Sequence, residues 1–275
     1  MEKIKILVAC HKKAEVYHDK VYTPIQVGKA LHQDLDLGFL NDNEGDNISE
    51  LNPYYSELTA EYWGWKNLDC EFIGLQHYRR YFDFVFTEDN VDRIFKNTDI
   101  ILAKPFYMGR TVFDHWSECF VPDDICIAMK LLEKLYPEDY AKGQAYLTNK
   151  IFYPCNMFVC RKALFDEFAT WEFPYLEELR KHVRMSQYSR DKRLLGYIAE
   201  GLLPMYFMNR GYKIETMPIA TIPKDGSRIT VGSWQQKARA HLLKALKKRN
   251  LRFGPNVLLW LKNDGILDEN YQLIL

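Results

Sequence analysis

The sequence predicts an α/β protein, built as a sandwich around a mainly parallel central sheet. Short apolar runs rich in β-branched residues, such as KIKILVAC at residues 3–10, alternate along the chain with segments of helical periodicity. The composition, 47% hydrophobic and 27% charged over 275 residues, is typical of a globular protein, and no Gly/Ser- or Pro-rich linker divides the chain. We therefore expect one main domain over residues 1–225 and a basic C-terminal tail over residues 226–275.

The expected strands are short, apolar and bounded by polar residues. They cover residues 3–10, 71–76, 99–103, 155–160, 212–214 and 217–222. Ligands of such sheets bind outside the carboxyl ends of the strands. The polar residues that come after the first two strands, His11 and residues 77–80, are therefore candidates for a ligand site, together with the loop at residues 42–49.

The expected helices follow the three- and four-residue spacing of apolar side chains. They cover residues 49–66, 123–135, 164–171, 175–183 and 191–203. Pro137 and Pro204 each come after a helical segment and are expected to end it. The acidic, Asn- and Gly-rich stretch at residues 37–49 is expected to be a loop.

Charge and targeting signals restrict the class of protein. No apolar run reaches the ~18–20 residues that cross a bilayer, and the N-terminus resembles no signal peptide, so a cytoplasmic protein is expected. The tail carries seven basic and no acidic residues between Ser233 and Arg252, interleaved with leucines. The stretch from Lys237 to Arg252 is either a solvated amphipathic helix that packs on the domain or one that binds an anionic membrane surface. No nucleic-acid motif accompanies it, so no nucleic acid is expected as a partner.

The densest group of candidate residues lies in the segment GLQHYRRYF. His77, Tyr78, Arg79 and Arg80 come after a buried strand there, which is costly unless an anion binds beside them. Arginines bind phosphate oxygens in bidentate fashion, and two adjacent ones suit a diphosphate. The alternative is that they pair with carboxylates of the acidic loop.

Three other segments offer polar candidates. Asp46 and Asn47 precede a predicted helix, where they either cap it or help to bind an anion. Asn156 lies in an apolar predicted strand and needs partners, of which a sugar hydroxyl is one option. Arg193 and Glu200 lie two turns apart on one helix face, so Glu200 is either a general base or a structural ion-pair partner.

Asp114, His115 and Trp116 form a weaker group, an acid and an imidazole beside a ring that could stack on a sugar. The motifs GxGxxG, GxSxG, HExxH and the Walker loop are absent from the sequence. The single DxD, Asp34-Leu35-Asp36, precedes any second strand that we can place, and we interpret it as surface.

The segments GDNIS, ELT, YWGWKN and GLQHYRRYF, followed by NMF and GYIAE, resemble a family of bacterial glycosyltransferases of capsular, exopolysaccharide and O-antigen synthesis. The family was long labelled as a domain of unknown function, and some members are similar to galactofuranosyltransferases. The resemblance runs from about residue 3 to residue 212. It implies a GT-A-like nucleotide-sugar-binding fold and a hexosyltransferase that uses a UDP-sugar donor.

The resemblance also implies roles for the candidate residues. The implied donor-binding residues are His11, Asp46, Asn47, Tyr78, Arg79, Arg80 and Arg193, and those beside the sugars are His115, Trp116 and Asn156. Glu200, with Asp114 as the alternative, would deprotonate the acceptor hydroxyl for an inverting attack.

The departure from the family pattern concerns the metal. In GT-A-like folds the strand end that corresponds to residues 74–76 of this chain normally carries a DxD, which holds a metal against the donor diphosphate, whereas this chain has Gln76 to Arg80 there. His77 and the arginines would supply that charge. We therefore predict a metal-independent enzyme, with Mn²⁺ or Mg²⁺ as the alternative.

The family resemblance implies a lipid-linked oligosaccharide acceptor at the inner face of the cell membrane. The competing interpretation is a non-catalytic component of the polysaccharide assembly machinery that binds nucleotide sugars or glycans. A phosphotransferase would need a phosphate loop or an Mg²⁺-holding carboxylate set, and neither is found. A glycoside hydrolase needs two opposed carboxylates and stays open.

Overall fold

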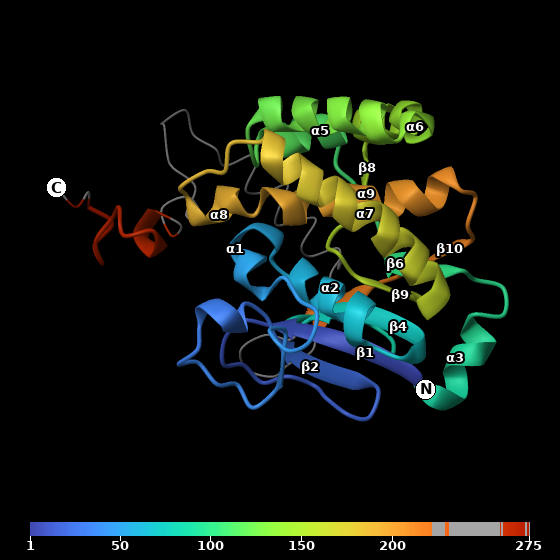
Figure 1. Cartoon of the computed structure of the whole chain (residues 1–275). Coiled ribbons are helices and arrows are strands. Elements are labelled where there is room, and N and C mark those ends of the chain that lie inside the picture. Colours follow the sequence, from blue (N-terminus) through green and yellow to red (C-terminus); the bar gives the residue numbers. More distant parts are fainter. Residues whose placement is uncertain (222–228, 231–258, 260, 273, 275) are drawn as a thin grey trace.

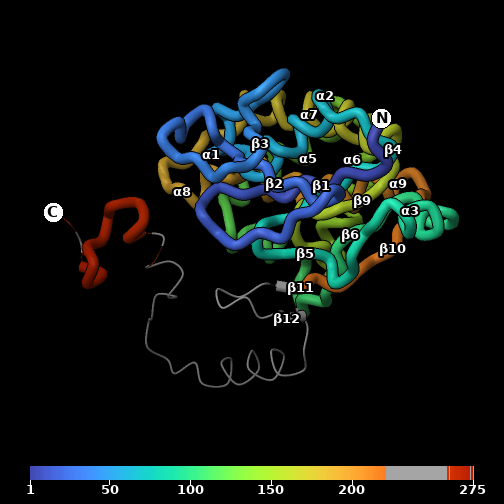
Figure 2. The backbone as a smooth tube through the Cα atoms, turned by 90° about the horizontal axis from the view of Figure 1, so that it is seen from below, coloured from blue at the N-terminus to red at the C-terminus, as the bar shows by residue number. Residues whose placement is uncertain are grey.

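The computed structural model describes residues 1–221, 229–230, 259, 261–272 and 274, and it confirms the predicted α/β class. The main path of the central sheet has the strand order β10-β6-β9-β4-β1-β2-β3, which can be traced in Figure 2. These strands are β1 (Glu2–Cys10), β2 (Tyr22–Gln26), β3 (Leu40–Asn41), β4 (Cys70–His77), β6 (Ile100–Ala103), β9 (Phe158–Arg161) and β10 (Ile214–Met217). All neighbours on this path are parallel except β9, which runs antiparallel to both β4 and β6.

The reversed strand β9 comes very close to β4 at Gly74. A Cβ atom at this position would lie 2.8 Å from the carbonyl oxygen of Phe158, which is closer than real Cβ contacts. Glycine therefore allows the two strands to pair in the observed register. Three short strands, β5 (Arg80–Phe82), β11 (Ile219–Thr221) and β12 (Ile229–Thr230), extend the sheet beyond β4. A separate two-stranded sheet joins β7 (Phe106–Tyr107) to β8 (Ile151–Phe152).

Alternate side chains of the strands enter two different cores. Leu7 and Ala9 of β1 pack on the helical side of the sheet, whereas Ile4, Ile6 and Val8 face the other side with helix α3 (Glu88–Ile94). This alternation results from the two-residue period of a strand that is buried on both faces. The helices of the larger core are α2 (Leu58–Asn67), α4 (Val112–Ser117), α5 (Pro122–Leu135), α6 (Pro137–Thr148), α7 (Lys162–His182) and α9 (Leu194–Asn209). Figure 1 shows α5, α6, α7 and α9 above the sheet.

Two predicted helix boundaries at prolines were wrong. The segments at residues 164–171 and 175–183 form one helix, α7, which continues through Pro174. Helix α9 likewise continues through Pro204, after the short helix α8 (Ser189–Lys192). Both prolines lie within long helices whose turns on either side of the proline are buried, although Pro174 itself is exposed. Packing of these turns outweighs the loss of one backbone hydrogen bond at each proline.

Two other predicted elements differ from the structure where the backbone turns left-handed. The helix expected over residues 49–66 is divided into a 3₁₀ turn η2 (Ser49–Leu51), α1 (Asn52–Tyr55) and α2, with a break at Ser56, whose φ is 53°. The strand expected over residues 155–160 begins only at Phe158, because Cys155 has a φ of 67°. Asn156 therefore lies in the loop before β9 and not inside the strand.

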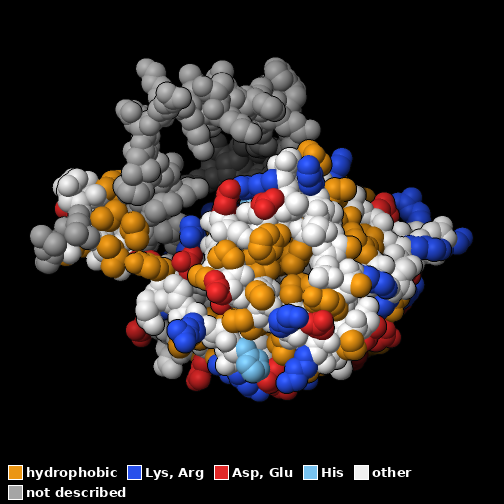
Figure 3. Space-filling model, turned by 90° about the horizontal axis from the view of Figure 1, so that it is seen from above, with side chains coloured by type: hydrophobic (Ala, Val, Ile, Leu, Met, Phe, Trp, Pro, Cys, Tyr) orange, Lys and Arg blue, Asp and Glu red, His pale blue; other side chains and the backbone are white. Residues whose placement is uncertain are grey.

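Figure 3 views the molecule from the side of α5 and α6, where hydrophobic side chains gather near the centre of the visible face and charged ones surround them. Val121 and Leu135, at the two ends of α5, are among the exposed hydrophobic residues. None of the helices in the described part of the chain is both long and apolar enough to span a bilayer. The basic stretch from Lys237 to Arg252 lies outside the described residues, so its predicted roles stay predictions.

Helices α2 and α7 bring together two buried carboxyl groups, Glu61 and Glu172, whose residues are 3% and 1% exposed. Burial raises the pKa of Glu61 to about 8, and burial together with the Glu61 charge raises the pKa of Glu172 well above its usual range. One oxygen of each carboxyl group has no hydrogen-bond partner in the described part of the chain. The pair is therefore most stable when it holds at least one proton.

We expect Glu172→Gln to raise the melting temperature, and to do so more at pH 8 than at pH 5. The folded-state pKa values lie above those of an unfolded glutamate. The free energy of unfolding is therefore greatest below an unfolded pKa near 4.5 and falls as the pH rises towards about 8. Glutamine keeps a hydrogen bond without needing a proton. Thermal melts from pH 5 to pH 9 would measure this effect, with Glu50→Gln as the exposed control; equal pH slopes for wild type and Glu172→Gln would contradict it.

Candidate active site

A cleft of about 620 Å³ opens at the carboxyl ends of β1 and β4. Its lining comes from segments far apart in the chain: the end of β1, the α1–α2 region, the segment after β4, and α8 with the start of α9. The predicted site residues on the cleft are His11, His77, Tyr78, Arg79, Arg80, Arg193 and Glu200. The structure thus brings together seven of the thirteen candidates.

Four fixed cations line this cleft: Arg79, Arg80, Lys192 and Arg193. In the described part of the chain, the side chains of Arg79 and Lys192 have no hydrogen-bonded or ion-paired partner, and Arg79 only packs 5.0 Å from the Tyr78 ring centre. The expected alternative, pairing of Arg79 and Arg80 with the acidic loop, is absent among the described residues. The Tyr78 hydroxyl is buried and also lacks a partner there. Hydrogen-bond donors and cations that have no protein partner, gathered in a concave site, favour the binding of an anionic ligand.

Glu57, which sequence reasoning did not select, lies at the centre of the site. Its Oε1 accepts a hydrogen bond of 2.9 Å from Asn156 Nδ2 and lies 3.7 Å from His77 Nε2, and its Oε2 lies 3.8 Å from Arg193 Nη2. Burial alone would raise the pKa of Glu57, but His77 and Arg193 outweigh it, and the net shift is downwards. Glu57 is therefore an ionised anchor for the residues around it.

Glu200 has the opposite electrostatic character. Burial, followed by the nearby charge of Glu57, raises the pKa of Glu200 to about 8, although Arg80 opposes the shift. When two carboxyl groups in one cleft have pKa values that are shifted in opposite directions, they typically take different roles in a reaction. Glu57 stays charged, whereas Glu200 gains or loses a proton close to neutral pH, as a general base must.

The left-handed turn at Cys155 connects Glu200 to Arg80. The Cys155 backbone hydrogen-bonds the Glu200 carboxylate, and Arg80 Nη1 donates to Cys155 Sγ over 3.4 Å. Burial raises the pKa of Cys155 to about 12, so its thiol is neutral. The loop before β9 thus orients one cation and one carboxyl group of the cleft.

The pKa values of His11 and His77, two of the histidines that line the cleft, are lowered. Burial, followed by the charges of Lys12 and Arg193, lowers the pKa of His11 to about 4. Burial also lowers the pKa of His77, more than the Glu57 charge raises it. The pKa of His77 is thus shifted against its charged form, whereas Arg79 and Arg80 supply fixed positive charge at the end of this strand.

Asp46, Asn47, Asp114 and His115 do not line the cleft. Asp46 is tied to helix α2 through Tyr62 and Asn67, and Asn47 bonds within its own loop. Asp114 forms a capping box with Thr111 at the start of α4, and His115 bonds Arg110. Asn47 and Asp114 thus accept hydrogen bonds from nearby backbone N–H groups, whereas Asp46 and His115 are paired with the side chains of Tyr62 and Arg110.

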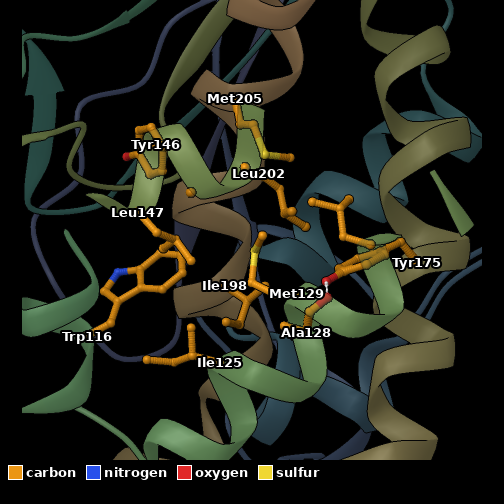
Figure 4. Close-up of a pocket in the computed structure, with 13 residues that line it drawn as sticks. Trp116, Ile125, Ala128, Met129, Tyr146, Leu147, Tyr175, Ile198, Leu202 and Met205 are labelled. Carbon is orange, nitrogen blue, oxygen red and sulfur yellow. Dashed lines mark hydrogen bonds between the residues drawn. The ribbon is translucent and has the colours of Figure 1, made fainter. Parts of the chain in front are cut away.

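Trp116 and Asn156 are buried rather than exposed to a sugar. Trp116 lies in the helical layer, where its ring borders an apolar cavity of about 30 Å³ with residues of α5, α6 and α9 (Figure 4). Gly201 of α9 leaves the space that this ring occupies. Asn156 joins Glu57 to the Gly196 carbonyl through its two amide hydrogens, so it acts on the cleft through Glu57.

The other polar residues of the cleft, for which no site role was predicted from the sequence, are His32, Asn52, Ser56, Ser189, Lys192 and Tyr197. Of these residues, Lys192 was the easiest to predict from the sequence, because it adjoins Arg193. Glu57 belongs to the segment ELT, which is part of the family resemblance, but Ser56 and Glu57 received no role because they fall inside a pattern that indicates an uninterrupted helix. In the part of the chain that the structure describes, no three His, Cys, Asp or Glu side chains cluster as a metal site would require, and Asp34 and Asp36 are exposed.

A family model described as a domain of unknown function (DUF4422) matches residues 5–211, three quarters of the chain. The chain belongs to the DUF4422 family. The boundaries of this match agree with the resemblance noted in the sequence, and they include every residue of the cleft. No curated protein matches the chain significantly.

This DUF4422 protein is also similar to a solved structure, the apo form of the bifunctional glycosyltransferase WbbM. The two chains share 29% sequence identity with a TM-score of 0.73, over 79% of this chain and 45% of that one. The similarity supports a GT-A-like assignment of the mostly parallel sheet and relates the DUF4422 chain to glycosyltransferases. The chain spans less than half the length of the WbbM chain.

Proposed function

We propose that this protein is a glycosyltransferase that moves a hexose from a UDP-sugar to a glycan acceptor. The observation that carries the proposal is the cleft at the carboxyl ends of β1 and β4. It combines four fixed cations with one carboxyl group whose pKa is close to neutral. The cations suit a donor diphosphate, and the carboxyl group suits removal of a proton from an acceptor hydroxyl. Similarity to WbbM supports the same class of reaction.

The proposed reaction is an inverting displacement. An acceptor hydroxyl oxygen attacks the anomeric carbon while the bond from that carbon to the β-phosphate oxygen breaks. Glu200 takes the hydroxyl proton, and UDP leaves with the electron pair of the broken bond. Arg79, Arg80 and Arg193 stabilise the charge that develops on the leaving phosphate, so we propose that they replace the usual metal ion.

The finer parts of the proposal derive from the family resemblance. They are a galactofuranose donor, a lipid-linked oligosaccharide acceptor, a role in capsule, exopolysaccharide or O-antigen synthesis, and a cytoplasmic enzyme that docks on the inner face of the membrane through the stretch from Lys237 to Arg252. UDP-galactopyranose and UDP-glucose are the next candidates for the donor. None of these choices alters the chemistry assigned to the cleft.

A donor panel with and without EDTA tests the proposal. We expect one of UDP-galactofuranose, UDP-galactopyranose or UDP-glucose to be hydrolysed slowly by the full-length protein, and EDTA to leave that rate unchanged. Loss of turnover in EDTA that manganese restores would contradict the metal-independent mechanism while leaving the transferase assignment intact. Tight UDP binding without turnover of any donor or transfer to any acceptor would favour the non-catalytic alternative.

A further inference from the structure

Ser56 adopts a backbone conformation that is unfavourable for serine. Its φ and ψ are 53° and −127°, and those of Glu57 are −63° and −17°. These values are close to the two central positions of a type II′ turn, the first of which glycine dominates because a Cβ atom is strained there. The residue is nevertheless a serine, in the turn that delivers Glu57 to the cleft.

Hydrogen bonds on both sides hold this turn in place. The Ser56 N–H donates to the Asn52 carbonyl over 2.7 Å, and Asn52 Nδ2 donates back to the Ser56 carbonyl over 2.8 Å. Thr59 Oγ1 donates to the same carbonyl over 3.2 Å. The surrounding structure therefore over-determines the strained conformation, as is typical of strain kept at functional sites.

The hydroxymethyl group that distinguishes serine from glycine contacts Arg193. Ser56 Oγ accepts a hydrogen bond of 2.8 Å from Arg193 Nε, its single hydrogen bond in the described part of the chain. Arg193 has one further polar partner there, Glu57, at the longer distance of 3.8 Å. Nε is consequently occupied, and Arg193, which lines the cleft just before α9, has its guanidinium beside Ser56 and Glu57.

We infer that Ser56 is a positioning residue, whose strained backbone and hydroxyl together orient Arg193 towards the diphosphate of the donor. The inference rests on the proposed function and adds to it a residue that acts through Arg193 rather than as a catalytic group. Glycine would adopt the turn without strain but would leave Arg193 unrestrained. Serine at this position therefore lowers the stability of the fold, but it fixes the orientation of the Arg193 side chain in the cleft.

The experiment compares Ser56→Gly, Ser56→Ala and Arg193→Ala with the double variant Ser56→Ala/Arg193→Ala, all in the full chain. UDP affinity is measured by titration calorimetry and stability by thermal melts. We expect Ser56→Ala and Ser56→Gly each to weaken UDP binding about tenfold, the effect of losing one hydrogen bond to a charged group. Ser56→Gly should also raise the melting temperature, whereas Ser56→Ala should not. Ser117→Ala, which removes a hydroxyl on α4 outside the cleft, is the control.

The double variant separates positioning from general damage to the structure. If Ser56 acts through Arg193, Ser56→Ala should cost no further UDP affinity in the Arg193→Ala background. Additive losses, or wild-type UDP affinity in Ser56→Ala while Arg193→Ala binds weakly, would overturn the inference and leave the proposed function standing. A wild-type protein that binds no UDP would overturn the proposed function itself.

Discussion

Replacing Arg79 and Arg80 together by alanine should lower kcat/KM for the donor by roughly 10³-fold or more. Both side chains line the cleft, and the structure gives Arg79 no hydrogen-bonding partner within the described residues. Their charge is thus available to a diphosphate, in the ground state and more strongly as the bond to the sugar breaks. Steady-state kinetics and UDP titration should show loss of both turnover and affinity.

Matched variants separate the loss of this site from a general loss of charge. Arg93→Ala removes an exposed arginine of α3, outside the cleft, and should leave the kinetics unchanged. Lysine at positions 79 and 80 should recover only part of the activity, because an ammonium group cannot bind phosphate in bidentate fashion. The proposed leaving-group stabilisation is refuted if the double alanine variant retains wild-type kcat/KM.

Glu200→Gln should lower kcat by roughly 10²–10⁴-fold while donor affinity stays near normal. The glutamine keeps the size and polarity of the side chain but cannot accept the acceptor's proton. UDP titration and single-turnover transfer would measure the two effects separately. Asp114→Asn is the informative comparison, because Asp114 caps α4 outside the cleft. If Asp114→Asn abolishes turnover and Glu200→Gln does not, the base is elsewhere.

The raised pKa of Glu200 also predicts the pH dependence of the wild-type enzyme. Burial and the Glu57 charge raise this pKa to about 8, and the base acts only when it is deprotonated. kcat/KM should therefore rise about tenfold per pH unit below pH 8 and level off above it. This rising limb should be missing from the residual activity of Glu200→Gln.

The part of the site that lies directly after strands was predictable from sequence. A buried strand that ends in polar residues marks its own carboxyl end, and His11 and Tyr78 to Arg80 come after β1 and β4, which are parallel neighbours. Arg193 and Glu200 were found because a helical period places them on one face. In each case a local pattern in the sequence corresponds to a position in space.

The remaining residues depend on features that local patterns do not record. Ser56 and Glu57 reach the cleft through a left-handed break in a segment whose apolar spacing indicates an uninterrupted helix. The sequence indicates that Asn156 needs hydrogen-bond partners, but it does not identify them, because Glu57 and the Gly196 carbonyl lie 99 and 40 residues away in the chain. An aromatic ring beside an acid, such as Trp116, is compatible both with stacking on a sugar and with a buried core, and the sequence alone does not distinguish these. Tertiary packing against Gly201 decides between these.

The direction of β9 has a consequence for finding such sites in related chains. Where every strand runs the same way, the ligand edge is formed by residues that come after strands. A strand inserted in the opposite sense presents its beginning at that edge instead, and here it contributes Cys155 and Asn156. In homologous sequences, the residues just before the strand that corresponds to β9 should therefore be inspected as carefully as those just after the parallel strands.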